Sequence, residues 1–423
     1  MNQHVQHKPV TAEIICVGTE LVSGHVVDTN SAHLATELAT IGIPVLRTST
    51  VRDDLQQIEN LVIERLKTAR LLIISGGLGP TEDDITRQAV SSALGRSLEL
   101  SSQIAAEIKR RFSHISIPDD VIKRQALVPQ GAILLKNSVG TAPGIVLDNE
   151  KATLILLPGV PEELRAITPH MLTLLLRRFP SDSLVLSHTL KTTGLGESTV
   201  NERIMPLMQT KEPSVSLLAV PGEVHIRLTA HGSSKQAEAA LSALKQKLRQ
   251  RVGEFIFGED SDTLEGIVAG LLLAQGLSLS LAESCTGGLI SHRLTNVPGV
   301  SARYLLGVAS YSNAAKTYML GVPADLIEKH GAVSPEVATA MAQGVRARSN
   351  SDIALGVTGI AGPTGGGNGK PVGLVYIALS SAEETMCTRY QFTGERKLVK
   401  WRASQAALEL LRNHLLHRSN KVR

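Results

Sequence analysis

Ser284 and its neighbour Cys285 are the side chains of this chain most readily assigned to nucleophilic chemistry, and both stand in the stretch AESCTGG (282–288). The apolar segment before it, LSLSLA, has the pattern of a buried strand, and the residues after it have the pattern of a helix. Ser284 is therefore expected at a strand-to-helix junction. From these residues three interpretations are open: Ser284 is a nucleophile, Cys285 is one, or the stretch is only a polar turn.

The same turn offers backbone hydrogen-bond donors. The N–H groups of Thr286, Gly287 and Gly288 could form an oxyanion hole for a tetrahedral intermediate. The simpler alternative is that Ser284 or Thr286 only caps the helix that follows. A serine nucleophile also requires a base, and no His–Asp partner is evident in the sequence.

Lys316, in the stretch YSNAAK (311–316), is the candidate base. Asn313 is expected to cap a short helix that ends at Gly321, which places Lys316 in the first turn of that helix. A cation there opposes the helix dipole, which lowers the pKa of the lysine, and partial burial lowers it further. A neutral lysine can accept the serine proton, as in Ser–Lys variants of the catalytic triad. A solvated surface lysine is the plainer alternative.

A second group of candidates lies in GGLGPTEDDITR (76–87). Its glycines leave backbone N–H groups free to approach a phosphate, and the N-terminus of the next helix favours anions. The acids Glu82, Asp83 and Asp84 would then hold a divalent cation that bridges to a pyrophosphate. The structural alternative has equal weight: Thr81 caps the helix and Asp84 completes a capping box.

Two further glycine-rich turns follow predicted strands. In VGTELVSG (17–24), Glu20 would point toward a substrate at the end of the first strand. The stretch TGIAGPTGGGNGKPVG (358–373) superficially suggests a Walker loop, but Thr364 stands where glycine is required and Pro371 replaces the Ser or Thr that would bind magnesium. A loop this rich in glycine could still wrap a phosphorylated ligand, or it could simply be flexible, and the first interpretation is favoured.

The composition restricts the class of protein. Hydrophobic residues make up 43% of the 423 residues and charged residues 19%, with a net charge of +4, which is typical of a globular chain of two or three domains. One tryptophan and 3% aromatic residues disfavour a protein that stacks single-stranded bases. Cys16, Cys285 and Cys387 are far apart, which argues against disulfides or a thiolate zinc site and predicts a cytoplasmic protein. No signal peptide or membrane span is expected.

The order of the predicted elements indicates an α/β, multidomain fold. Over residues 1–172, strands such as EIICVG (13–18) and LLIISGG (71–77) alternate with helices, which predicts a parallel sheet with ligands at the carboxyl ends of its strands. Residues 173–256 contain two alternating apolar and polar strands and predict a small α+β module. A second α/β unit is expected over 257–423.

Taken together, these stretches resemble one family, the CinA family of competence/damage-inducible proteins of bacteria, from about residue 12 to 415. The resemblance implies a molybdopterin-binding-like parallel-sheet domain, a small α+β KH-like domain and a C-terminal α/β CinA domain in the three segments above. The motifs that carry it are VGTELVSG, GGLGPTEDD, VGTAPG (139–144), LPGVPEE (157–163), GEVHIRLTA (222–230), AESCTGG, YSNAAK, HGAVS (330–334) and TGIAGPTGGG…KPVG.

The C-terminal domain is similar to nicotinamide mononucleotide deamidases, which convert that nucleotide to nicotinate mononucleotide and ammonia without a cofactor. The matching serine and lysine of that group are nucleophile and base, so the resemblance implies these roles for Ser284 and Lys316, and Tyr311 as a further catalytic residue. It favours Ser284 over Cys285. The positions implied to contact substrate are Glu283, Thr286, Gly287, Gly288, Asn313, Thr358, Gly359 and Gly362.

For the first domain, family members hydrolyse ADP-ribose to AMP and ribose 5-phosphate with a divalent metal ion (Mg, Mn or Co). The resemblance implies Asp83, Asp84 and Glu162 as metal ligands. One departure is visible in LLAVPGEV (217–224): many relatives carry a Y-A-K-type stretch there, and the missing lysine would weaken contact with a phosphate. The positions implied at the substrate are Glu20, Asn30, Gly76, Gly77, Thr81, Gly140 and Thr141.

The expected partners are small nucleotides, nicotinamide mononucleotide and ADP-ribose, in pyridine nucleotide recycling. The KH-like segment lacks a G-x-x-G loop, because GLGES (194–198) is a poor substitute, so it is expected to pack between domains or onto the first active site and not to bind nucleic acid. The resemblance implies a homodimer. The alternative is a competence or DNA-repair interaction protein with vestigial enzymatic sites and a recombinase partner, although no membrane helix or basic stripe supports it.

Overall fold

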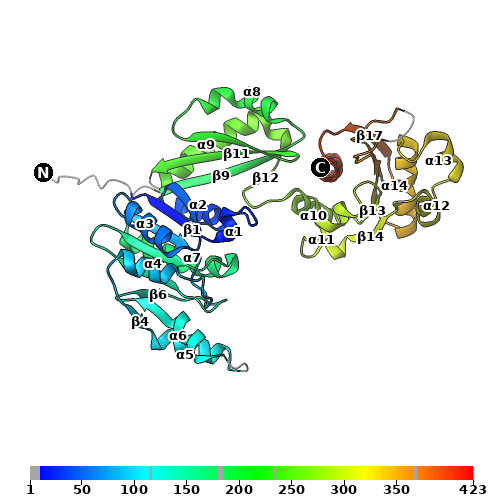
Figure 1. Ribbon diagram of the computed structural model, residues 1–423. Helices are drawn as coiled ribbons and strands as arrows, with labels where there is room; N and C mark the ends of the chain where they lie inside the picture. The colour runs from blue at the N-terminus through cyan, green and yellow to red at the C-terminus, as the bar shows by residue number, and fades with distance from the viewer. Residues whose placement is uncertain (1–9, 114–116, 180–183, 233, 366–368, 423) are drawn as a thin grey trace. The chain divides into compact units, whose positions relative to one another are not determined.

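The computed structural model describes residues 10–113, 117–179, 184–232, 234–365 and 369–422. The chain forms two compact units, Met1–Leu186 with Ala230–Ala239, and Ser187–Thr229 with Ala240–Arg423. Figure 1 shows the helices and strands of both, coloured along the chain. Both units are mixed α/β structures, which confirms the fold class predicted from the sequence.

The first unit is built on a six-stranded sheet in the order β2-β1-β3-β8-β7-β6. Strands β1 (Ala12–Val17), β2 (Val45–Val51), β3 (Leu71–Ser75) and β8 (Thr153–Leu157) are parallel, and β6 (Ile133–Leu135) and β7 (Gly144–Asp148) are antiparallel. Strands β1, β3 and β8 are buried along their whole length, because helices cover both faces of this sheet.

Two pairs of helices provide that cover. Helices α2 (Asn30–Thr40) and α7 (Pro161–Arg178) pack on one face, and α3 (Leu55–Arg65) and α4 (Thr86–Ala93) pack on the other. A one-turn helix, α1 (Thr19–Val22), follows β1. A smaller cluster joins α5 (Ser102–Arg111) to α6 (Asp119–Ala126), beside the paired strands β4 (Leu98–Leu100) and β5 (Leu127–Pro129).

The second unit contains a five-stranded sheet in the order β14-β13-β15-β16-β17. Strands β13 (Leu279–Glu283), β14 (Tyr304–Ala309) and β15 (Ile353–Gly359) are parallel, whereas β16 (Leu374–Ser380) and β17 (Thr385–Gln391) are antiparallel. One face packs against α10 (Leu264–Gln275), α11 (Leu289–Thr295) and α15 (Arg396–Val422). The other face packs against α12 (Asn313–Leu320), α13 (Ala324–His330) and α14 (Pro335–Ser349).

A four-stranded sheet in the order β10-β11-β9-β12 accounts for the small α+β module that the sequence predicts. Its strands are β9 (Leu184–Thr193), β10 (Ser214–Val220), β11 (Glu223–Gly232) and β12 (Ile256–Glu259). The accompanying helices are α8 (Glu197–Met208) and α9 (Ser234–Val252), and short 3-10 helices lie at Gly253–Phe255 and Val300–Ala302. Strand β12 leads directly into the second unit's larger sheet through α10.

Two predicted helix starts are wrong. Thr81 does not cap α4: the helix begins at Thr86 after Ile85, because residues 79–84 close a loop of their own. Helix α12 is capped by the hydroxyl of Ser312, which accepts from the N–H of Ala315 at 3.1 Å, so Asn313 is its first residue and not its cap. Among the described helices, none is long and apolar enough to cross a membrane.

Candidate active site

The ammonium nitrogen of Lys316 lies 3.0 Å from the hydroxyl oxygen of Ser284. Strand register explains how residues so far apart in sequence meet: β13 and β14 are parallel neighbours, and Glu283 pairs with Ala309 at their ends. Ser284 follows the first strand, and Lys316 reaches back from the first turns of the helix after the second. Both side chains are withdrawn from solvent, with Ser284 8% and Lys316 1% exposed.

The surroundings of Lys316 favour its neutral form. Its nitrogen also donates to the carbonyl oxygens of Ser310 at 3.0 Å and Tyr311 at 3.4 Å. Within the described residues no carboxylate forms an ion pair with it. Burial lowers the pKa of Lys316 below its usual value of 10.5. A lysine of this kind can accept a proton from the serine that it contacts.

Cys285 does not compete for the nucleophilic role. Its side chain is 5% exposed and packs in the apolar cluster beneath the sheet. Burial raises the pKa of the thiol to about 12, so the reactive thiolate is scarce near neutral pH. The neighbouring residues in AESCTGG thus divide into a reactive hydroxyl and a structural thiol.

The turn from Ser284 to Gly288 supplies fewer free backbone donors than the sequence suggested. Gly287 and Gly288 both adopt left-handed backbone conformations, and the N–H of Gly287 closes the turn onto the carbonyl of Ser284 at 3.1 Å. Among the described hydrogen bonds, the N–H groups of Thr286 and Gly288 donate to no carbonyl oxygen, and the buried hydroxyl of Thr286 also lacks a partner. These three groups are the donors that the turn leaves available to an oxyanion.

Glu283 anchors the turn through hydrogen bonds to the start of α11. Its carboxylate accepts from the N–H of Ile290 at 3.1 Å and from the N–H and hydroxyl of Ser291 at 2.9 and 2.6 Å. The side chain, 1% exposed, therefore satisfies the free amides at the start of α11. Glu283 thus has a structural role, and its expected substrate contact stays a prediction.

Tyr311 is held above the site by an arginine that the sequence analysis did not identify. The Arg396 guanidinium donates to the Tyr311 hydroxyl at 2.7 Å and to the carbonyl of Gly362 at 2.6 Å. Arg396 thereby joins the turn after β14 to the glycine-rich loop after β15. Tyr311 is 62% exposed, and Asn313 is exposed as well, so both are accessible to a ligand.

The loop after β15 is fixed by contacts to the segment His330–Ser334. The hydroxyl of Thr358 donates to the carbonyl of Ala332 at 2.8 Å, and Lys370 donates to the carbonyls of His330 and Val333 at 2.8 and 2.6 Å. A Cβ at Gly359 would lie 2.7 Å from the carbonyl oxygen of Leu374, so the strand end requires glycine. Thr358 thus has a positioning contact. The central part of the loop, residues 366–368, lies outside the described residues.

In the first unit, three strand ends meet closely at the predicted ligand edge. Asn30 donates to the hydroxyl of Ser75 at 3.0 Å and to the carbonyl of Gly159 at 2.8 Å, which ties α2 to the turns after β3 and β8. A Cβ at Gly76 would lie 2.1 Å from the carbonyl of Val17. Glycine is therefore required by this packing as well as by any ligand. Glu20 is exposed on α1 nearby in sequence.

The loop from Gly79 to Asp84 is closed by its own side chains. Asp84 accepts from the N–H of Gly79 at 2.7 Å and from the N–H and hydroxyl of Thr81, the N–H at 2.8 Å. Arg87, 2% exposed, donates to the carbonyls of Leu78 at 3.0 Å and Gly79 at 2.8 Å. Asp84 and Thr81 are thus committed to shaping the loop. The positive-φ residue Gly77 packs against α4, where a Cβ would overlap the hydroxyl of Thr86.

A second loop of this unit contains Gly140 and Thr141. Arg111 donates to the carbonyl of Gly140, and Gln125 donates to the hydroxyl of Thr141 at 2.6 Å. The carboxylate beneath this loop is Glu163, since a Cβ at Gly140 would fall 1.9 Å from it, whereas Glu162 is exposed. Glu163, which the sequence analysis did not select, therefore supports the loop.

The structure does not gather the predicted metal ligands. In the described part of the chain, one set of His, Cys, Asp or Glu ligand atoms lies within 4.8 Å of one another: His188, Glu259 and Asp260. Asp83, Asp84 and Glu162 do not meet that spacing, and Asp84 is occupied as above. The metal assignment stays a prediction that this arrangement does not support.

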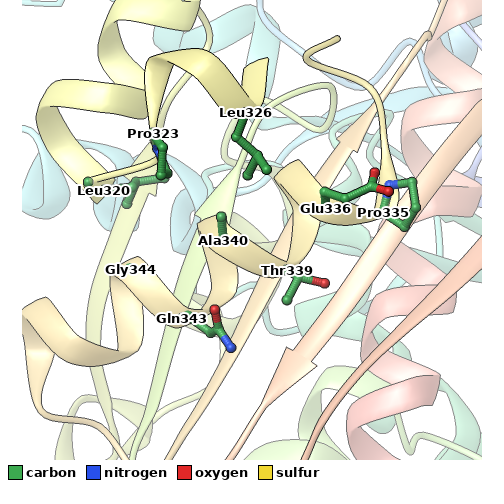
Figure 2. A pocket seen from close by; sticks show the side chains of 10 residues that line it. Leu320, Pro323, Leu326, Pro335, Glu336, Thr339, Ala340, Gln343 and Gly344 are labelled. Carbon is green, nitrogen blue, oxygen red and sulfur yellow. The ribbon is translucent and has the colours of Figure 1, made fainter. Parts of the chain in front are cut away.

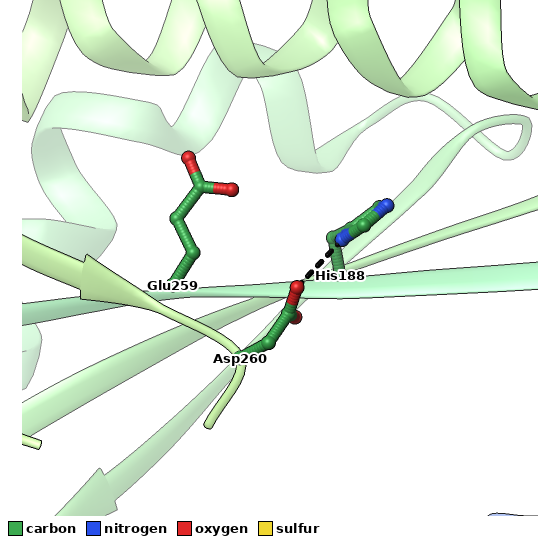
Figure 3. Close-up of side chains that lie close together, drawn as sticks. All are labelled: His188, Glu259 and Asp260. Atoms are coloured by element: carbon green, nitrogen blue, oxygen red, sulfur yellow. Dashed lines mark hydrogen bonds and ion pairs between the residues drawn. The ribbon is translucent and has the colours of Figure 1, made fainter. Parts of the chain in front are cut away.

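The set His188, Glu259 and Asp260, shown in Figure 3, already has protein partners. Glu259 forms ion pairs with Lys245 and Arg249, each at 2.6 Å. Asp260 accepts from His188 at 2.8 Å and from the N–H of Thr189 at 2.8 Å. Lys245 and Arg249 already neutralise the carboxylate of Glu259. The contact between His188 and Asp260 joins β9 to the residue after β12.

Comparison with known proteins matches three family models along the chain. They are described as "Probable molybdopterin binding domain" over residues 13–178, "Damage-inducible protein CinA KH domain" over 187–258 and "CinA C-terminal domain" over 261–415. A competence-damage inducible protein of Caldicellulosiruptor saccharolyticus is 42% identical over 410 residues, covering 96% of this chain and 99% of that protein. This chain belongs to the CinA family.

Other members of the CinA family are similarly related. A competence-damage inducible protein of Moorella thermoacetica is 43% identical over 405 residues, covering 95% of this chain and 97% of its own length. The crystal structure of a CinA superfamily protein from Klebsiella pneumoniae is 36% identical, with a TM-score of 0.36, over 36% of this chain and 96% of that one.

A groove of about 750 Å³ lies elsewhere on the CinA C-terminal domain, between α12, α13 and α14. Figure 2 shows its lining, which includes Leu320, Pro323, Leu326, Thr339 and Gln343. Neither Ser284 nor Lys316 lines this groove. It is therefore separate from the Ser–Lys pair.

Three arginines of this CinA protein escaped sequence reasoning: Arg87 and Arg293, which are buried, and Arg396, which is exposed. A weak signal was present for two of them. Arg87 precedes Val90 by three residues, and Arg293 follows Ile290 by three, so each shares the apolar face of its helix. A charged side chain on such a face must find buried acceptors.

Proposed function

We propose that the second unit is an amidohydrolase that deamidates nicotinamide mononucleotide to nicotinate mononucleotide and ammonia. The observation that supports it is the 3.0 Å contact between the buried Lys316 nitrogen and the Ser284 hydroxyl. The contact has the arrangement of a nucleophile with its base. The choice of substrate comes from the resemblance of this domain to deamidases within the CinA family.

In this mechanism Lys316 begins neutral and takes the proton of Ser284 as the serine oxygen attacks the carboxamide carbon. The amide N–H of Gly288 and the hydroxyl of Thr286 stabilise the oxyanion. The protonated lysine then gives its proton to the departing nitrogen, so that ammonia leaves and an ester remains on Ser284. Lys316 next removes a proton from water, whose oxygen attacks the ester carbon. The protonated lysine returns this proton to the Ser284 oxygen as the ester C–O bond breaks, which restores the serine hydroxyl and releases the acid, ionised to the carboxylate at neutral pH.

The substrate assists this chemistry. The cationic pyridinium ring of the nucleotide withdraws electrons from its carboxamide, so a serine activated by one lysine is a sufficient nucleophile. Two segments adjoin the Ser–Lys pair: Tyr311, whose carbonyl accepts from Lys316 and whose hydroxyl accepts from Arg396, and the loop that begins at Thr358, directly after the residue whose carbonyl accepts from the N–H of Ser284. They are the groups available to orient the ribose and phosphate.

The test is ammonia release from nicotinamide mononucleotide by the purified protein and by the variant Ser284→Ala. The loss expected for a covalent nucleophile is about 10⁴-fold or more in kcat. Deamidation by Ser284→Ala at the wild-type rate, or a folded wild-type protein that releases no ammonia, would contradict the proposal.

A second activity, cleavage of ADP-ribose to AMP and ribose 5-phosphate, is proposed for the first unit. It is supported by the close meeting of the turns at Gly76 and Gly159 beside a loop preorganised by Asp84 and Arg87. Backbone N–H groups in such turns bind phosphate oxygens. The proposal is tested by measuring AMP release with and without added divalent metal ion, and no AMP in either condition would contradict it.

A further inference from the structure

Arg293 connects the nucleophile turn to the last helix of the chain. It lies on α11, the helix that begins directly after Gly288, and it is 4% exposed. Its guanidinium donates to the hydroxyl of Ser404 at 3.0 Å and to the side-chain oxygen of Gln405 at 2.8 Å. It also stacks on the ring of Trp401, 4.5 Å from the ring centre. Three residues of α15 thus hold one residue of α11.

The same face of α15 receives the turn between β10 and β11, in the same compact unit. The indole N–H of Trp401 donates to the carbonyl of Pro221 at 2.8 Å. The side-chain amide of Gln405 donates to Glu223 at 2.9 Å. Trp401 and Gln405 therefore each have two partners, Arg293 on one side and the β10–β11 turn on the other.

Contacts further along α15 show that this docking is continuous. Glu409 accepts from the hydroxyl of Thr193 at 3.3 Å, and burial raises its carboxyl pKa. Arg412 donates to the carbonyl of Ile256 at 2.7 Å. Residues 401, 405, 409 and 412 recur every three or four positions and so share one face of the helix. The α+β module therefore contacts α15 over three turns of that helix.

The nucleophile turn is rigidly joined to this junction. Glu283, the residue before Ser284, holds the first turn of α11, as described above. Lys400, next to Trp401, has its nitrogen 3.5 Å from the position that a Cβ on Gly287 would take. A displacement of α11 relative to α15 would therefore move the turn that carries Ser284 and its oxyanion donors.

We infer that the β10–β11 turn of the KH-like module is a positioning element of the amidohydrolase site, acting through Trp401, Gln405 and Arg293. This inference rests on the proposed deamidase function. The turn lies within LLAVPGEV (217–224), and its Pro221 and Glu223 make the contacts with α15.

The substitution Gly222→Ala tests the inference from the far side of the junction. Gly222 has φ +85°, and an added Cβ would lie 2.8 Å from Cγ of Gln405, so alanine strains the turn and pushes it from α15. The matched control is Gly196→Ala in the same module, where φ is −78° and no atom lies within 4 Å of the added Cβ. Neither residue belongs to the Ser–Lys site.

Two measurements follow on the full chain: steady-state deamidation of nicotinamide mononucleotide, and fluorescence of Trp401, the single tryptophan. For Gly222→Ala we expect emission shifted to longer wavelength and kcat lowered about 3- to 30-fold with KM unchanged, since coupling through packed networks has this size. Gly196→Ala should match the wild type in both. Trp401→Phe, which keeps an aromatic ring but removes the N–H that donates to Pro221, should lower kcat by less than Gly222→Ala does.

The outcomes separate this inference from the function on which it rests. A wild-type kcat in Gly222→Ala despite shifted emission would overturn the positioning role, and so would unshifted emission with a wild-type kcat. A raised KM with unchanged kcat would indicate a role in substrate binding and would also overturn it. A wild-type protein without deamidase activity would instead remove the proposed function.

Discussion

The turn after β13 and the turn after β3 have the same local design but use their polar side chains differently. Each follows a buried parallel strand, contains two adjacent left-handed glycines and leads toward a helix. In the first, Ser284 and Lys316 contact each other and little else that is charged. In the second, Asp84 and Arg87 form their hydrogen bonds with residues of the loop itself.

The two turns differ in whether their polar side chains are available to a ligand or only shape a loop. A hydroxyl beside a desolvated amine keeps its reactivity, because neither group is neutralised by a stronger partner. A carboxylate whose oxygens already accept three hydrogen bonds, as those of Asp84 do, is less available to a metal ion or substrate. The glycine-rich sequence pattern is the same in both turns, so the partners of the side chains distinguish them.

The largest effect is expected when the base is removed. Lys316→Met should lower deamidase kcat about 10³- to 10⁴-fold, because no other base in the described part of the chain contacts Ser284. Lys316→Arg keeps the positive charge but cannot become neutral, so it should be equally inactive. The measurement is ammonia release by each variant, with folding checked by circular dichroism. Substantial activity in Lys316→Arg would show that a neutral base is not required.

The pH dependence of deamidase kcat also tests whether Lys316 acts as a neutral base. Burial lowers the pKa of Lys316, so its neutral fraction rises over a lower pH range than that of an ordinary lysine. Deamidase kcat should therefore rise about tenfold per pH unit on the acid side and level off above the lowered pKa. A pH–rate profile of kcat between neutral and alkaline pH checks this. A rate that falls as pH rises would require a protonated lysine and would contradict the mechanism.

In the first unit, Asp84→Asn should have an intermediate effect. An amide nitrogen in place of one oxygen cannot accept from the Thr81 donors, so the loop loosens and AMP release from ADP-ribose should fall about tenfold. Raising the divalent metal concentration should not restore the rate. AMP release by Asp84→Asn is compared with that by Asp83→Asn, which removes the carboxylate of an exposed neighbour in the same loop. Full recovery of Asp84→Asn with metal would assign Asp84 to the metal ion after all.

The smallest effect is expected at Cys285. Cys285→Ala removes a buried thiol and should cost about 1 kcal/mol of unfolding free energy through the cavity left behind. Deamidase kcat should stay within about twofold of the wild type, since the Ser284 nucleophile is retained. Denaturant unfolding and ammonia release measure the two quantities. A loss as large as that of Ser284→Ala would return the nucleophilic role to the thiol.

Local patterns predicted the elements of this chain well. The apolar strands at 71–75 and 353–359 and the strand-to-helix turn at Ser284 are where the hydrophobic periodicity and the glycines indicated. Errors occurred at helix starts, where Ser312 and not Asn313 is the cap. Capping depends on which side chain has the required backbone angles, and neighbouring polar residues compete for that position.

The sequence by itself determined which candidate side chains are present and that Ser284 and the loop from Gly76 each follow a strand, because strand periodicity and turn residues are local properties. Only the tertiary structure decided which of them act together. Ser284 contacts Lys316 because β13 and β14 are neighbouring strands in register. Asp84 is less available to a ligand because it already accepts hydrogen bonds from Gly79 and Thr81. Arg293, Trp401 and the β10–β11 turn meet through three separate segments, and such long-range contacts leave no local pattern to read.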